Sequence, residues 1–159
     1  MTVQEFMADQ IVRIADSLAS FLESTDPARV LWQPDPPGNA PARSALELAQ
    51  ECVTVNHYFA ALLRGEAIEA PAGGFRGTPL ADVADARRQL TESSAELAGA
   101  IRALDDAALA KTYSHWRGPV SGDKLIIGAY RNMAYHAGQV NLIQILGGDA
   151  EFHVPPSWY

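Results

Sequence analysis

The sequence predicts an all-α fold, a four-helix bundle with long connections. Four segments of roughly 20 to 25 residues carry apolar side chains every three or four positions, which is the spacing of one helix face. Proline- and glycine-rich segments separate them. Runs with the alternating pattern of a β-strand are almost absent. Four amphipathic helices of this length bury their apolar faces against one another in a bundle.

The first predicted helix covers residues 3–24, where apolar residues such as Ile11, Ile14 and Leu18 share one face. Five prolines between residues 27 and 41 end it, because proline cannot occupy a helix interior. The second predicted helix covers residues 44–64. Ser44 and Glu47 have the spacing of a capping box at its start, and a glycine follows its end.

The third helix is predicted to begin with Thr78 as its N-cap and Pro79 as its first residue, and to continue to about residue 104. The segment "DDAALAKTYSHWRGPVSG" then forms a long connection with one short helical turn. The fourth helix is predicted to start at a cap on Ser121 and to end at Leu146, before a glycine pair. The two long connections indicate a topology other than the simplest up-down-up-down order.

Composition narrows the function classes. The 159 residues are expected to form a single domain spanning residues 1–159. A net charge of −7 and the lack of a basic run exclude a typical nucleic-acid surface. The N-terminus lacks the pattern of a signal peptide, and no apolar stretch is long enough to span a membrane. The single cysteine, Cys52, fits a reducing compartment, so the expected location is the cytoplasm.

Two predicted helices place polar side chains on the faces that should be buried. Asn132, His136 and Gln139 share a stripe with apolar residues of the helix at 121–146, and Glu51 lies on a stripe with Val55 in the helix at 44–64. Buried polar groups need partners. These residues therefore form a hydrogen-bonded core cluster, line a cavity or build a metal site, since carboxylates and imidazoles from facing helices build metal sites in bundles. Glu51 has the further alternatives of a salt bridge to an arginine or a position at a groove.

Two motifs carry a family resemblance. "YHAGQVNLIQILGGD", with the residues just before it, is similar to the pattern H-x-x-x-H-x-G-Q, and "WQPDPPGNAPARSALELAQE" is similar to a tryptophan–proline loop followed by a serine-capped helix. The chain resembles the DinB/YfiT-like family over nearly its whole length, and the resemblance is sharpest in these two motifs. The resemblance implies a four-helix bundle, often homodimeric, that holds a divalent metal, often nickel or zinc, with three histidines. Some members use the metal to activate a small thiol.

Carried over residue by residue, the resemblance places His136 at the second histidine of the pair, Asn132 at the first and Glu51 at the histidine of the second helix. An amide oxygen suits nickel or zinc poorly. The altered set implies a weaker metal site, one that takes manganese or iron, or a site without metal. Gln139 belongs to the motif and is expected to satisfy bundle contacts, and Tyr135 and Val55 are expected to border a pocket.

The remaining histidines, the cysteine and the tryptophans have separate expected roles. His115 and His153 are candidates for a missing ligand or for ordinary loop residues, and Cys52 is expected in the core rather than as a nucleophile. His57 lies on a face expected to be solvated, and the three tryptophans are expected to close the bundle ends. Three functions follow as hypotheses: a metal-dependent enzyme, a non-catalytic small-molecule-binding protein and a dimeric structural bundle.

Overall fold

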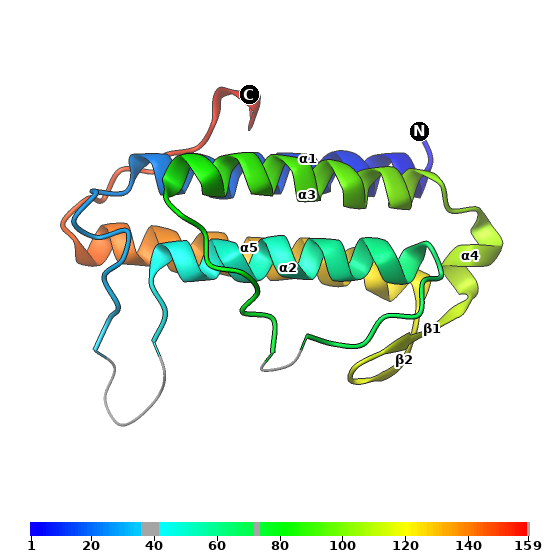
Figure 1. The fold of residues 1–159 in the computed structure, drawn as a ribbon. Helices are drawn as coiled ribbons and strands as arrows, with labels where there is room; N and C mark the ends of the chain where they lie inside the picture. The colour runs from blue at the N-terminus through cyan, green and yellow to red at the C-terminus, as the bar shows by residue number, and fades with distance from the viewer. Residues whose placement is uncertain (36–41, 72–73, 159) are drawn as a thin grey trace.

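The computed structural model describes residues 1–35, 42–71 and 74–158. Four long helices form a bundle (Figure 1), which confirms the predicted fold class: α1 (Val3–Ser24), α2 (Ala45–Leu63), α3 (Val83–Arg102) and α5 (Gly122–Leu146). Between α3 and α5 lie a short helix, α4 (Asp106–Ala110), and a hairpin of β1 (Thr112–His115) and β2 (Gly118–Ser121). A 3₁₀ turn, η1 (Pro156–Trp158), follows near the C-terminus.

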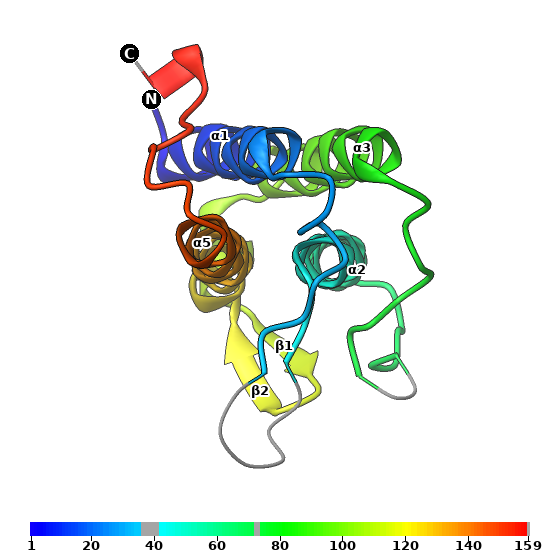
Figure 2. The ribbon, with the colours of Figure 1, turned by 90° about the vertical axis from the view of Figure 1, so that its left-hand side faces the viewer.

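The helices do not follow one another around the bundle in chain order. Helix α1 packs against α3 and α5, and α2 packs against the same two helices, so α1 and α2 lie on a diagonal (Figure 2). Helices α2 and α3 run in the same direction, and the long segment between them returns along the bundle (Figure 1). The predicted departure from up-down-up-down order is therefore confirmed. Helices α2 and α5, which are far apart in the sequence, lie side by side and carry the polar residues described below.

Local sequence sets the ends of these helices. Ser44 caps α2 as predicted, since its hydroxyl accepts from the Glu47 N–H while the Glu47 carboxylate accepts from the Ser44 N–H. The predicted start of α3 at Thr78 was wrong. The helix begins four residues after Pro79, where the Asp82 carboxylate accepts from the Asp85 N–H and makes the stronger cap. Ser121 does precede α5, but its side chain makes no capping hydrogen bond.

The hairpin is a regular element that the sequence pattern did not predict. Its strands are only four residues each, too short for an alternating pattern to be recognised. Tyr113 pairs with Val120, is buried and donates from its hydroxyl to the carbonyl of Ala108 in α4. Gly122 then lets α5 start against α4, because a Cβ there would lie 2.5 Å from that same carbonyl oxygen. The hairpin is thus fixed beside the end of the bundle that holds the start of α5.

The core is built from the apolar faces of the four long helices. Its fully buried large side chains include Ile11 and Leu18 of α1, Leu90 of α3 and Met133 of α5. Residues 36–41 and 72–73, on either side of α2 in the sequence, lie outside the described residues. Three of the five prolines predicted to interrupt the helices, Pro36, Pro37 and Pro41, are among them. In the described part of the chain, no helix has both the length and the hydropathy needed to cross a membrane.

Candidate functional site

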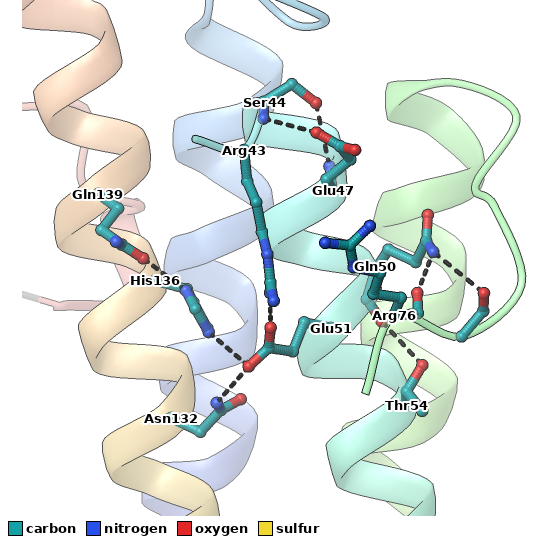
Figure 3. Close-up of polar contacts among 11 residues, drawn as sticks. Arg43, Ser44, Glu47, Gln50, Glu51, Thr54, Arg76, Asn132, His136 and Gln139 are labelled. Atoms are coloured by element: carbon teal, nitrogen blue, oxygen red, sulfur yellow. Dashed lines mark hydrogen bonds and ion pairs between the residues drawn. The ribbon is translucent and has the colours of Figure 1, made fainter. Parts of the chain in front are cut away.

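Glu51 on α2 faces Asn132 and His136 on α5 (Figure 3). Oε1 of Glu51 lies 3.1 Å from Nε2 of His136 and 3.4 Å from Nδ2 of Asn132. Asn132 and His136 are one helical turn apart, so both point toward the same part of the neighbouring helix. His136 is 5% exposed and Asn132 and Glu51 are partly buried. The structure therefore brings together the three residues that the sequence singled out.

Arg43 is the arginine that pairs with Glu51, a kind of partner that the sequence allowed without indicating which arginine. It lies in the loop just before the Ser44 cap, and its guanidinium forms an ion pair with Oε2 of Glu51 (Figure 3). Oε1 remains directed at α5. Helical periodicity says nothing about a loop residue. The sequence shows only that a positively charged residue directly precedes the Ser44 N-cap. The Arg43 guanidinium, which comes from the loop, thus balances the negative charge of the Glu51 carboxylate.

Gln139 fixes the orientation of the His136 ring. Its Oε1 lies 2.6 Å from Nδ1 of His136, one turn further along α5, so it serves the imidazole directly. Burial, and secondarily the Arg43 charge, lower the pKa of His136, although the contact with Gln139 acts in the opposite direction. In the neutral ring with its proton on Nδ1, that proton is donated to Gln139 and the Nε2 lone pair faces Glu51.

Asn132 leaves one polar atom without a partner. Its Nδ2 faces Glu51, while Oδ1 is buried and has no hydrogen-bond partner among the residues that the structure describes. A buried carbonyl oxygen of this kind normally binds a donor or a cation. The amide also has two nearly equivalent orientations, and the other one directs Oδ1 at the carboxylate. That orientation is favourable only when a cation lies between the two oxygens.

The donor atoms present fit a single divalent cation of moderate affinity. Glu51 Oε1, His136 Nε2 and Asn132 Oδ1 offer one nitrogen and two oxygens, and the 3.1 Å between Oε1 and Nε2 is close to the separation of neighbouring ligands around one metal ion. Among the described residues, no three histidine, cysteine, aspartate or glutamate side chains form such a group. Any cation would therefore depend on the amide of Asn132.

Two pockets adjoin this cluster. The first has a volume of about 350 Å³, and its lining includes Arg43, His136 and Gln139. The second has a volume of about 670 Å³, and its lining includes Val55 and Asn132. Glu51 and Tyr135 line both pockets. The cluster therefore borders both pockets.

The other histidines are placed apart from the cluster or bonded elsewhere. His153 contacts Asp149, and the exposed His57 pairs with Glu96, as its solvated face predicted. His115 lines the second pocket, where its ring stacks on Phe59. Cys52 is fully buried, as expected, and burial raises the pKa of its thiol.

The sequence profile of the DinB superfamily matches residues 10–140. The chain belongs to the DinB superfamily. The crystal structure of a conserved protein of Enterococcus faecalis is similar to this DinB chain with a TM-score of 0.72 and 14% sequence identity, over 93% of this chain and 99% of that one. At this identity the likeness supports the DinB fold alone. No curated protein matches the chain.

Proposed function

We propose that this DinB superfamily protein binds a divalent metal at Glu51, His136 and Asn132, and that the metal site serves a small molecule bound in the adjoining pockets. The observation that carries the proposal is the grouping of metal-ligating atoms between α2 and α5. Glu51 Oε1 lies 3.1 Å from His136 Nε2, and the buried Asn132 Oδ1 has no described partner. A carboxylate, an imidazole and an amide grouped in this way match the ligand types of a divalent cation.

Compared with three histidines, this donor set is a better match for manganese and iron(II) and a poorer match for nickel and zinc. One imidazole, one carboxylate and one amide form a harder set than three histidines. When bound, the metal would supply a Lewis acid that lowers the pKa of a coordinated thiol or water. The residues of the chain supply the rest: Gln139 sets the tautomer of His136, and Arg43 holds Oε2 of Glu51 so that Oε1 points at α5. A thiol-dependent transferase would be one use of such a site.

Metal titration by calorimetry tests this proposal. The protein is stripped with a chelator and titrated with manganese, zinc and nickel. His136→Ala should abolish specific binding, whereas Asn132→His should tighten binding of zinc and nickel, because it exchanges a weak amide for an imidazole. His57→Ala is the matched control, since His57 is an exposed histidine on α2 outside the cluster. Equal binding by the wild type and His136→Ala would contradict the proposal.

Arg43 supports a second function, a metal-free small-molecule-binding bundle. Its guanidinium already supplies the positive charge that a metal would bring to Glu51. With the His136 proton on Nε2, and the Gln139 amide turned so that its N–H group donates to Nδ1, Glu51 accepts from Arg43, Asn132 and His136 in a closed network around the carboxylate. Arg43→Met separates the two functions. It should tighten metal binding if the cluster is a metal site, and it should lower stability without any metal binding if the cluster is a closed network.

We also propose that the protein is a homodimer in the cytoplasm. Leu142, Ile145 and Leu146 form an exposed apolar strip at the end of α5, and Tyr135 is exposed earlier on the same helix. Exposed apolar surface of this kind supports association with another protein surface. Light scattering coupled to size-exclusion chromatography tests the dimer, and Leu142→Glu should convert it to a monomer. A monomeric wild type would contradict this part of the proposal.

A further inference from the structure

The second pocket is a groove with an aromatic wall, built by side chains from three separate segments. Phe59 comes from α2, Phe75 from the loop after α2, and His115 and Trp116 from the hairpin. The His115 ring stacks on Phe59 with centroids 5.8 Å apart and an interplanar angle of 5°. Trp116 lies 5.7 Å from His115 and 5.8 Å from Phe75. The four rings therefore form one continuous surface, and Trp116 lines this pocket instead of only closing a bundle end.

The same groove carries an excess of positive charge. Arg117, Lys124 and Arg131 line it, and all three are exposed. In the part of the chain that the structure describes, none of them has a carboxylate within 4 Å, whereas Glu51, the acidic side chain of the lining, is paired with Arg43. Arg117 also lies over the Trp116 ring, with its guanidinium carbon 4.4 Å from the ring centroid. The whole chain has a net charge of −7, so three cations without a carboxylate partner on one groove are opposite in sign to the overall charge. Such a groove attracts anions.

We infer that this aromatic groove binds a small anionic molecule that carries a flat ring. The ring would pack on the wall at Trp116 and His115, and a carboxylate or phosphate group would face Arg117, Lys124 and Arg131. A cationic ligand is disfavoured by these side chains, and a small inorganic anion would leave the aromatic wall uncovered. The volume of about 670 Å³ suits a ligand of one or two rings.

This inference deepens the proposed function, because the groove also contains Glu51 and Asn132. A ligand seated on the aromatic wall would lie next to the candidate metal site. Its binding to the wall and the cations does not itself require metal. Ligand binding is therefore measured on chelator-treated protein, so that failure of the inference and failure of metal binding give separate results.

Calorimetric titration with matched probes tests the inference. The probes 1-naphthoate and 1-naphthyl phosphate carry a ring and an anion, 1-naphthylmethanol is neutral, and 1-naphthylmethylammonium is cationic. Acetate and inorganic phosphate carry the anions alone. The two ring-bearing anions should bind at least about tenfold more tightly than the other four probes, because each exposed ion pair adds a modest increment and three act together. Their binding should weaken as salt is added, and the ratio of the two affinities identifies the preferred anion.

Variants locate the site. The triple variant Arg117→Gln, Lys124→Gln, Arg131→Gln should lose about tenfold in affinity for the anionic ring probes and little for 1-naphthylmethanol. A control triple variant, Arg13→Gln, Arg88→Gln, Arg102→Gln, removes the same number of positive charges from other parts of the surface. It should bind like the wild type. Trp116→Ala should weaken every ring-bearing probe, since half-exposed Trp116 supplies part of the wall.

Three results would overturn the inference. The first is equal binding of the neutral and anionic naphthyl probes by the wild type. The second is an equal loss of affinity in the groove variant and in the control triple variant. The third is the absence of binding of any naphthyl probe at millimolar concentration. Circular dichroism of each variant checks that a loss of binding does not arise from unfolding.

Discussion

Replacing Glu51 by leucine tests whether the polar cluster is engaged in the folded protein. In metal-free protein with the His136 proton on Nε2, Glu51 is the shared acceptor for His136, Asn132 and Arg43. Leucine of similar size removes all three contacts at once. The Nδ2 group of Asn132 and the Nε2 group of His136 would then be buried against a hydrocarbon side chain, and neither would have a replacement partner in the described cluster.

The expected cost follows from the contacts. Hydrogen bonds to a charged acceptor contribute about 1.5–3 kcal/mol, and the two here are long, at 3.1 Å and 3.4 Å, so the lower part of that range applies to the pair. The contact with Arg43, whose side chain is 32% exposed, adds at most about 1 kcal/mol. Leucine recovers about 1 kcal/mol by burial. The free energy of unfolding should therefore fall by about 2 kcal/mol.

Urea unfolding in the presence of a chelator measures this change, and a thermal scan should show a midpoint about 4–8 °C lower. Glu92→Leu is the matched control, because Glu92 is an exposed acid on α3 whose pair with Arg88 lies on the surface. It should change the unfolding free energy by less than about 0.5 kcal/mol. A Glu51→Leu variant as stable as the wild type would show that the contacts of the Glu51 carboxylate do not stabilise the folded protein.

Three further predictions concern the core. Asn56→Leu should raise the unfolding free energy by about 1 kcal/mol in urea titrations, because the fully buried Oδ1 of Asn56 has no described partner and Ser93 keeps its bond to a backbone carbonyl. Gln144→Met should lower it by about 1 kcal/mol in the same assay, because the side chain loses its 2.9 Å bond from α5 to the Phe21 carbonyl. Cys52 should react with a thiol reagent only at the rate of unfolding, since it is fully buried and its thiol pKa is raised.

The helices were predictable because their signals are local and repeated. Apolar residues at helical spacing and the capping box at Ser44 are readable in a single sequence, and α2 begins where they predict. The start of α3 was misplaced because Thr78 and Pro79 match a helix start as well as Asp82 does, and only the folded loop decides between them. The hairpin was missed because strands of four residues carry too little pattern.

The candidate site was predictable only where its residues lie on helices. Periodicity placed Glu51, Asn132 and His136 on inward faces, and packing of α2 against α5 brought them together. Arg43 could not be found in this way, because a loop residue has no periodic position and its contact depends on the path of the loop. The aromatic groove was missed for a similar reason. Its wall joins residues from α2, a loop and the hairpin, and no sequence spacing connects them.

Metal content is the most direct test of the central claim, that Glu51, His136 and Asn132 hold a divalent cation. Protein without a histidine tag is purified without chelator and analysed for its elements, beside a Glu51→Ala, His136→Ala double variant. We expect near-stoichiometric manganese, iron, nickel or zinc in the wild type and none in the variant. Wild-type protein that carries no metal, even after incubation with each of these four ions, would contradict this claim.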